Sequence, residues 1–410
     1  MEKIVIVDDD ADIRRIAELR LRIAGFSVFA AEDGEAGLRL IRAEKPRVVL
    51  LDLMMPKLHG FAVCQAIRSD PGLQGTFIIV ASAKTYTADV KKAKELGADL
   101  YINKPYDLDG LVETIQTALA SRGAAIAVKF WGTRGSIPTP GRSTLRYGGN
   151  TSCVEVRCGE TVILLDCGTG AREAGLAFAK EFKGKTLHAH VFVSHTHWDH
   201  IQGFPFFVPA YVPGNHLTLY SVRGADKSLE KIFTGQMDSS YFPVDLTDMM
   251  ARLDFVELEG TIELGSAKIR HTYLNHPGLA VGFRIEAEGK TVVYITDHEP
   301  YSRLSGESDH NRKLDREVDE FARGAEIYIR EAQYTEEEYP AKRGWGHSTW
   351  KDAVNSAHAA NAKQLVLYHH DPMHDDDFLD EVVASCRSYI REQGMTVECS
   401  AAADFQQLSI

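Results

Sequence analysis

The densest group of potential catalytic residues in the chain is the segment HTHWDH at residues 195–200. It follows the β-rich run LHAHVFVS, so it lies where a strand passes into a loop. Neutral imidazoles and a carboxylate are ligands suited to Zn²⁺, Mn²⁺ or Fe²⁺. An isolated histidine is more often a core or surface residue, but four potential ligands within one short segment predict a metal site. These four are His195, His197, Asp199 and His200.

Three further candidate ligands stand at the ends of later strand-like segments. His276 occurs in LNHPG, Asp297 in YITD and His369 in LVLYHH. Together with the first four, they are enough for two metals with one carboxylate between them. Two metals about 3.5–4 Å apart can share a hydroxide as nucleophile and clamp a phosphoryl or acyl oxygen. His370 adjoins His369 and is an alternative ligand; His369, which ends the apolar strand, is preferred.

A second group of polar residues follows strand-like segments within residues 1–120. Acidic residues end KIVIVDD and RVVLLD, a hydroxyl ends TFIIVAS, and a lysine follows ADLYIN. Converging carboxylates suit a hard cation such as Mg²⁺ and leave room for a phosphate, which a lysine could neutralise and a serine could bind. The residues concerned are Asp8, Asp9, Asp52, Ser82 and Lys104.

The elements that must position these residues fall into two regions. Residues 1–120 alternate strand-like and helical stretches, which predicts an α/β domain with a doubly wound parallel sheet. The predicted linker is residues 121–126, which begin with the polar and small-residue stretch SRGAA. Residues 127–410 consist mainly of short strand-like runs separated by Gly/Pro turns, with helical stretches near 350–361 and 376–393.

Composition excludes several classes of protein. The 410 residues are 44% apolar and 25% charged, which is typical of a soluble globular protein. The sequence has no uninterrupted apolar run of about 18 residues, so no transmembrane helix is predicted. The segment MEKIVIVDDD does not have the pattern of a signal peptide. The six cysteines include no CxxC pair, so we expect reduced thiols in a cytoplasmic protein. A net charge of -12 argues against broad nucleic-acid binding.

The first region resembles a response-regulator receiver domain. The resemblance is carried by VDDD, LDLMMPKLHG, VASAK and YINKP. It implies bound Mg²⁺ and a phosphoryl donor, such as a histidine kinase, as partner. The implied roles are phospho-acceptor for Asp52, metal-binding acids for Asp8 and Asp9 (with Asp52), phosphate partner for Lys104, and switch residues for Ser82 and Tyr101.

The second region resembles the metallo-β-lactamase fold superfamily, through HxHxDH followed by His, Asp and His. The resemblance implies an αβ/βα sandwich over residues 127–410 that holds two transition metals, zinc or else manganese or iron. It further implies that Asp297 bridges the two metals. The redox-active flavo-diiron branch usually has HxExDH; His197 stands at that glutamate position, which disfavours oxygen or nitric oxide reduction. The implied ligand groups are His195, His197 and His276 for one metal, and Asp199, His200 and His369 for the other.

Two later segments, REAQY (330–334) and GWGHST (344–349), resemble parts of the transfer-RNA 3′-processing and phosphonate-pathway phosphodiesterase branch. The resemblance implies that His347 is a general acid or transition-state hydrogen-bond donor and that Glu331 orients it. Arg330 stands where that branch has a histidine, which is a departure from the pattern. GHST is also a candidate helix N-cap.

Two other segments have less specific patterns. The glycine-rich stretches 131–141 and 146–153 are either tight turns or an anion-binding loop helped by Arg134 or Arg146. Residues 203–250 are rich in aromatics and prolines and are a candidate lid or dimer contact over the metals.

The leading hypothesis is a two-component response regulator with a dinuclear metallohydrolase output, a phosphodiesterase controlled by phosphorylation of Asp52. The acidic charge and the lack of a long basic arm favour a small anionic phosphodiester or cyclic nucleotide over RNA. Three alternatives stay open: hydrolysis of a lactone, thioester or β-lactam, a non-catalytic metal-bound scaffold, and diiron redox chemistry. A second copy of the chain is a candidate partner, whereas a membrane is not.

Overall fold

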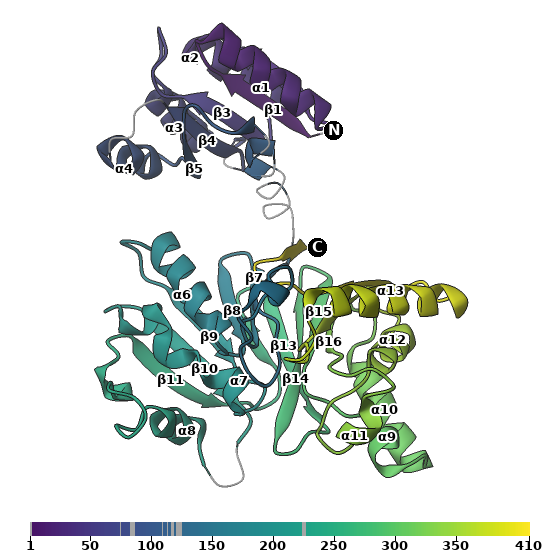
Figure 1. The fold of residues 1–410 in the computed structure, drawn as a ribbon. Helices are drawn as coiled ribbons and strands as arrows, with labels where there is room; N and C mark the ends of the chain where they lie inside the picture. Colours follow the sequence, from purple (N-terminus) through teal and green to yellow (C-terminus); the bar gives the residue numbers. More distant parts are fainter. Residues whose placement is uncertain are drawn as a thin grey trace. The chain divides into compact units, whose positions relative to one another are not determined.

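The chain divides into two compact units, Met1–Ala124 and Ala125–Ile410 (Figure 1). This computed structural model describes a set of ranges that leaves out short stretches of the chain. The described residues are 2–73, 75–82, 87–108, 110–112, 114–115, 119, 125–223 and 227–410. Among them, no helix is both long enough and apolar enough to cross a membrane.

The first unit contains a five-stranded parallel sheet in the order β2-β1-β3-β4-β5. The segment VVLLD, which forms β3, is buried along its whole length, as expected for a parallel strand covered on both faces. The predicted doubly wound α/β domain is confirmed. The strands are β1 (Lys3–Val7), β2 (Ser27–Ala31), β3 (Val48–Asp52), β4 (Phe77–Ser82) and β5 (Leu100–Asn103), and the helices α1 (Ala11–Ile23), α2 (Gly34–Glu44), α3 (Gly60–Ser69) and α4 (Thr87–Glu95).

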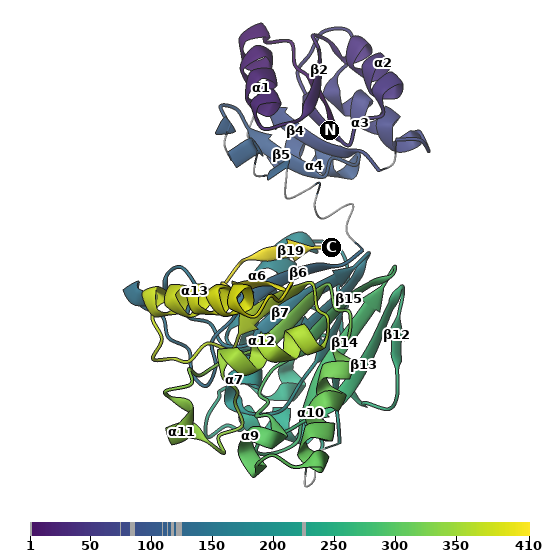
Figure 2. The ribbon, with the colours of Figure 1, turned by 90° about the vertical axis from the view of Figure 1, so that its right-hand side faces the viewer.

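The second unit is a sandwich of two seven-stranded sheets (Figure 2). The first sheet has the order β11-β10-β9-β8-β7-β6-β19, and its strands are β6 (Ala127–Gly132), β7 (Cys153–Cys158), β8 (Thr161–Leu165), β9 (His188–Phe192), β10 (His216–Ser221), β11 (Arg252–Glu257) and β19 (Gln407–Ser409). The second has the order β12-β13-β14-β15-β16-β17-β18, and its strands are β12 (Ile262–Leu264), β13 (Ala267–Leu274), β14 (Ala280–Ala287), β15 (Lys290–Ile295), β16 (Ile327–Glu331), β17 (Gln364–Tyr368) and β18 (Glu398–Ala401).

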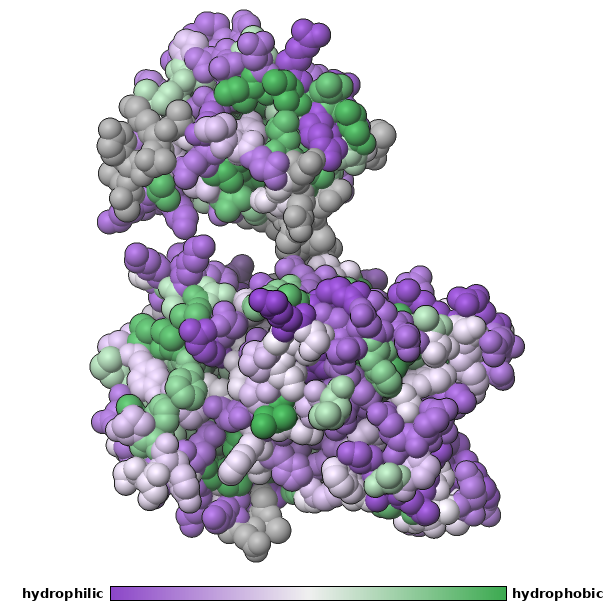
Figure 3. Space-filling model, in the orientation of Figure 1, coloured by the Kyte–Doolittle hydropathy of each residue, from purple (hydrophilic) through white to green (hydrophobic). Residues whose placement is uncertain are grey.

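Helices cover the outer faces of the sandwich. An apolar cluster that includes Phe178 of α6 packs on the outer face of the first sheet, and one that includes Val354 of α12 and Val383 of α13 packs on that of the second. On the face shown in Figure 3, hydrophobic side chains of this unit lie in separate patches among hydrophilic ones. The helices are α6 (Gly170–Glu181), α7 (Trp198–Ile201), α8 (Leu229–Gln236), α9 (Tyr301–Ser305), α10 (Asp309–Phe321), α11 (Tyr339–Lys342), α12 (Trp350–Ala359) and α13 (Asp376–Glu392).

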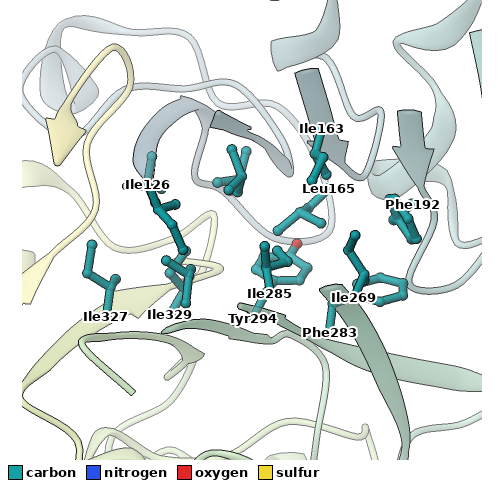
Figure 4. Packing of buried hydrophobic residues seen from close by; sticks show 14 of the residues in the cluster. Ile126, Ile163, Leu165, Phe192, Ile269, Phe283, Ile285, Tyr294, Ile327 and Ile329 are labelled. Carbon is teal, nitrogen blue, oxygen red and sulfur yellow. The ribbon is translucent and has the colours of Figure 1, made fainter. Parts of the chain in front are cut away.

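The core of the sandwich lies between the two sheets. Leu165 and Phe192 from the first sheet meet Phe283 and Tyr294 from the second in one buried cluster (Figure 4). Alternate residues of β16 divide between layers, since Ile329 belongs to this central cluster and Tyr328 to the cluster beneath the helices. The αβ/βα sandwich predicted for this region is confirmed.

Two predictions about segments need correction. The linker was predicted to extend to residue 126, but Ile126 is fully buried in the central core and its N–H donates to the carbonyl of Ile410. Residues 125 and 126 therefore belong to the second unit, while 121–124 lie outside the described residues. The aromatic segment 203–250 is not simply a lid, because it contains β10 and α8 and buries Phe204 and Phe233 in the outer core.

Candidate functional site

Three strand ends turn sharply at one edge of the sandwich. The residues just beyond β8, β15 and β17 include Asp166, Asp297 and His369, whose φ angles are +62°, +42° and +58°. A residue with a side chain enters this left-handed region only at an energetic cost. All three side chains are buried next to the side chains of HTHWDH. The backbone of these turns therefore directs Asp166, Asp297 and His369 into one site.

The ligand residues predicted from the sequence converge in the structure. Asp297 lies between the two halves: its Oδ2 is 3.4 Å from His195 Nε2, and its Oδ1 is 3.3 Å from His200 Nε2 and 3.2 Å from His369 Nε2. Ligand atoms within 4.8 Å of one another form two main groups that match the predicted ones. These are His195, His197, His276 and Asp297 in one group, and Asp199, His200 and His369 in the other.

Hydrogen bonds at the Nδ1 atoms orient most of the imidazole rings. His200 Nδ1 lies 2.8 Å from Asp166 Oδ2, and His276 Nδ1 lies 2.9 Å from the carbonyl oxygen of Gly346. His369 Nδ1 lies 3.0 Å from Gln333 Oε1. An acceptor at Nδ1 places the proton there and leaves the Nε2 lone pair free for a metal.

The choice between the two adjacent histidines follows from their surroundings. His369 Nε2 lies 3.0 Å from Asp199 Oδ2, within the ligand group. His370 Nε2 instead faces the carbonyl oxygen of Ala402, at 2.9 Å, away from the ligands. The geometry thus favours His369 as the ligand.

The charges at the site are strongly coupled. Although burial opposes ionisation, contacts with His200 and His369 hold the pKa of Asp199 well below its usual range. Burial likewise opposes ionisation of Asp297, but the neighbouring histidines hold its pKa well below the usual range. Both carboxyl groups are therefore ionised and available as ligands.

The donor set fits two divalent transition metals. Its imidazole nitrogens and carboxylate oxygens are the ligands that zinc, manganese or iron accept. His195 Nε2 is buried without a hydrogen-bond partner, an arrangement that a bound metal would satisfy. We therefore assign this edge of the sandwich as a candidate dinuclear metal site.

His347 and Glu331 lie next to this site. His347 Nδ1 is buried without a hydrogen-bond partner, 4.0 Å from both Asp297 Oδ2 and Glu331 Oε2. Glu331 Oε1 accepts hydrogen bonds from the N–H and the hydroxyl of Ser348, both at 2.7 Å. Burial raises the pKa of Glu331 to about 7 and lowers that of His347 to about 3. The N-cap interpretation also holds, because Thr349 begins α12 with a capping box.

A buried glutamate fixes the loop that carries His347. Glu299 accepts hydrogen bonds from the N–H groups of Gly344 and Gly346, and also from the Tyr339 hydroxyl at 2.7 Å. The φ angles of the two glycines are +88° and +89°, and a Cβ at Gly346 would meet His276 Nδ1 at 2.1 Å. Only glycine allows the loop to approach this ligand so closely.

The pocket beside the ligands has a volume of about 440 Å³. This size suits a small molecule. Its lining comprises Ser136, Thr196, His197, Trp198, Asp199, Asp297, His347 and His369.

Sequence reasoning missed Asp166, Gln333 and Ser136. Asp166 ends the apolar strand TVILLD, the same signal that identified Asp52 and Asp297. Gln333 belongs to REAQY, a segment singled out for its glutamate alone. Ser136, whose N–H donates to Asp199 Oδ2 at 2.7 Å, has no comparable signal.

The two arginines considered for anion binding both hold neighbouring loops. Arg134 is fully buried and donates to the backbone carbonyls of Gly148, Asp371 and His374. Arg146 forms ion pairs with acidic residues of α13, including Asp377. These contacts favour the tight-turn alternative for the two glycine-rich stretches over an anion-binding loop.

The first unit brings its predicted residues together at the strand ends. The ligand atoms of Asp8, Asp9 and Asp52 lie within 4.8 Å of one another, so these acids fit a Mg²⁺ site. Lys104 Nζ lies 2.7 Å from Asp8 Oδ2 and 2.5 Å from Asp52 Oδ2. Burial raises the pKa of Asp8, against the influence of Lys104. The other two predicted residues, Ser82 and Tyr101, lie at the end of β4 and in β5.

Comparisons with known families divide the chain in the same way. A family model described as the response regulator receiver domain matches residues 4–116, and one described as the beta-lactamase superfamily domain matches residues 161–370, about half of the chain. The probable transcriptional regulator ycf27 of Porphyridium aerugineum is 45% identical over 118 residues, which are 29% of this chain and 48% of that protein. The chain thus spans about half the length of the curated relatives it matches.

Two solved structures resemble the second unit. The metallo-beta-lactamase fold protein YhfI from Bacillus subtilis is 20% identical, with a TM-score of 0.51, over 70% of this chain and 99% of that one. The short form of human tRNase Z is also 20% identical, with a TM-score of 0.47, over 69% and 99%. At this identity the likeness to YhfI concerns the fold alone.

Proposed function

The chain belongs to the beta-lactamase superfamily and carries a response-regulator receiver domain, and on that premise we propose that it is a metal-dependent phosphodiesterase controlled by phosphorylation. The observation that carries the proposal is the position of His347. Its ring lines the pocket, and its Nδ1 is buried without a hydrogen-bond partner beside the ligand Asp297. Such a side chain beside the ligands favours catalysis over a metal-bound scaffold without activity.

The residues divide the chemistry between them. The two ligand groups would hold two divalent ions, which supply Lewis-acid stabilisation of a phosphoryl group and lower the pKa of water. The His347 ring is placed to donate a hydrogen bond to an oxygen on which negative charge develops. Glu331, anchored by Ser348, lies behind His347 and restricts the positions open to its ring.

The catalytic half is tested with metal-loaded protein and bis(p-nitrophenyl) phosphate. We expect hydrolysis that a chelator abolishes and that metal restores. His347→Gln should lower kcat by about 10²- to 10⁴-fold while the metal content stays unchanged. His310→Gln, at an exposed position on α10, is the matched control and should behave as the wild type.

A substrate panel separates the phosphodiesterase from its rivals. A lactone, a thioester and a β-lactam should each react more slowly than the phosphodiester. If one of them is the better substrate, the proposed bond is wrong. If His347→Gln keeps full activity with both metals bound, His347 has no catalytic role.

The regulatory half rests on the receiver residues. A receiver domain implies a phosphoryl donor such as a histidine kinase, and we propose Asp52 as the acceptor, with Mg²⁺ held by Asp8, Asp9 and Asp52. Lys104 contacts Asp52 and would bind the added phosphoryl group, while Ser82 and Tyr101 would respond to it. Hydrolysis should change after treatment with acetyl phosphate and Mg²⁺ in the wild type but not in Asp52→Asn. Equal rates in the treated and untreated wild type would contradict control by phosphorylation.

A further inference from the structure

Two exposed tryptophans that the fold does not use stand in the metal pocket or on the loop that carries His347. Trp198 lines the pocket and is 79% exposed, and Trp345 lies two residues before His347 and is 58% exposed. The other two tryptophans of the chain are packed, since Trp131 is buried in the apolar cluster outside the first sheet and Trp350 is half-buried against the cluster outside the second. Large aromatic side chains left in solvent beside a pocket usually serve binding.

The loop around Trp345 is built to hold that ring outward. The flanking residues Gly344 and Gly346 both have left-handed φ angles, and both N–H groups donate to the buried carboxylate of Glu299. This fixed backbone exposes Trp345 while it buries His347 two positions later. The exposure of Trp345 is therefore a consequence of the same contacts that position His347.

A cation accompanies the aromatic rings. Lys342 Nζ lies 4.4 Å from the centroid of the Trp345 ring and 5.8 Å from that of Tyr334, whose ring packs edge-on against His347. None of the carboxylates in the described part of the chain forms an ion pair with Lys342. Its charge is thus available to an anionic ligand.

We propose that Trp198, Trp345 and Lys342 together form a rim that binds a nucleotide, with the base on the tryptophans and an anionic group on the lysine. The two tryptophans adjoin residues that meet at the site, because His276 contacts both the carbonyl oxygen of Gly346 and the ring of His197. The inference rests on the proposed function, because it names the substrate class of the same site as a nucleotide phosphodiester. An aromatic plane and an isolated cation together match the two parts of a nucleotide that lie outside the scissile bond. The pocket volume of about 440 Å³ fits a ligand of this size.

Two esters with the same leaving group isolate the contribution of the base. They are thymidine 5′-(p-nitrophenyl) phosphate and methyl p-nitrophenyl phosphate. Trp198→Ala and Trp345→Ala should each lower kcat/KM for the thymidine ester by roughly 5- to 100-fold and lower kcat/KM for the methyl ester by a clearly smaller factor. Trp198→Phe and Trp345→Phe should keep most of the wild-type kcat/KM for the thymidine ester. Tyr241→Ala is the matched control, because it removes an aromatic ring that is 81% exposed and belongs neither to the pocket lining nor to the loop that carries His347.

A binding experiment that needs no turnover separates this inference from the proposed function. By calorimetry, the metal-loaded protein should bind thymidine 5′-phosphate more tightly than deoxyribose 5-phosphate, and Trp345→Ala should remove the difference. Lys342→Gln should weaken binding of thymidine 3′,5′-bisphosphate more than that of thymidine 5′-phosphate. If neither ester is hydrolysed but base-dependent binding is seen, the nucleotide site stands and the proposed function fails.

Three results would overturn the inference. The first is hydrolysis of both esters with no loss specific to the thymidine ester in the tryptophan variants, which would leave the proposed function intact. The second is equal binding of thymidine 5′-phosphate and deoxyribose 5-phosphate. The third is that the tryptophan variants differ from the wild type in sedimentation velocity but not in binding or hydrolysis. That result would show that Trp198 and Trp345 contact a second copy of the chain.

Discussion

Asp166 makes the sharpest single-residue prediction about the metal site. Its carboxylate accepts four hydrogen bonds: from the N–H of Ser194 at 2.7 Å, from the Ser194 hydroxyl at 2.8 Å, from Tyr294 at 2.7 Å and from His200 Nδ1 at 2.8 Å. The change Asp166→Asn suits the backbone, because asparagine tolerates a φ of +62°. It replaces one accepting oxygen with a donating NH₂ group in a fully buried position.

The size of the effect follows from these contacts. In either orientation of the amide a buried donor faces the NH₂ group, and His200 Nδ1 loses its hydrogen bond to a charged acceptor, because it meets either the NH₂ group or a neutral carbonyl oxygen. Such a bond contributes about 1.5–3 kcal/mol, which corresponds to roughly 10- to 100-fold in affinity. The loss should fall mainly on the metal held by Asp199, His200 and His369, because Asp166 directly orients His200.

The assay is a competition titration with a chromophoric chelator, read as two dissociation constants. Asp166→Asn should weaken one site by about 10- to 100-fold and leave the other less affected. Tyr294→Phe is the matched control: it removes one of the four donors but not the contact with His200, so both sites should change by no more than about threefold. Unchanged affinity in Asp166→Asn, with stability confirmed by urea unfolding, would refute the claim that Asp166 orients His200.

Three further predictions concern single positions. Gly346→Ala should lose metal at the His276 group, because its Cβ would meet the His276 ring. Gly394→Ala is also at positive φ but has open space around it, so it should lose about 1 kcal/mol of stability and no metal. Metal analysis and thermal unfolding of the two variants check both outcomes. Gln333→Leu should lower metal affinity by roughly 10- to 100-fold, and Gln333→Glu, which keeps an acceptor for His369, should not; equal losses would contradict the orienting role. Asp52→Asn should abolish incorporation of ³²P from labelled acetyl phosphate, and labelling that persists in this variant would place the acceptor elsewhere.

Much of the architecture could be predicted because local patterns determine it. Apolar runs such as VVLLD are buried on both faces, and their polar last residues meet at one edge of a parallel sheet. HTHWDH likewise predicted four candidate ligands at once, since a single strand-to-loop turn carries them. The order of His, Asp and His downstream supplied the remaining candidates through a family resemblance.

Other features depend on contacts between distant segments and left no local signal. The roles of Asp166 and Gln333 arise only when β8 and β16 approach the ligands. The sequence could not show that Arg134 would donate to carbonyl groups more than two hundred residues away, so it left the tight-turn and anion-binding alternatives equally open. The linker was drawn too long because Ile126 pairs with the distant Ile410.

The left-handed residues at the ends of β8, β15 and β17 carry an evolutionary consequence. Each non-glycine residue in this conformation costs roughly 1–2 kcal/mol, so Asp166, Asp297 and His369 hold the fold below the stability that its topology allows. Glycine at any of the three would relax the backbone and remove a group that the metals need. At Asp166 this relaxation would leave four buried donors without an acceptor, so a lineage released from selection for hydrolysis should acquire glycine first at Asp297 or His369.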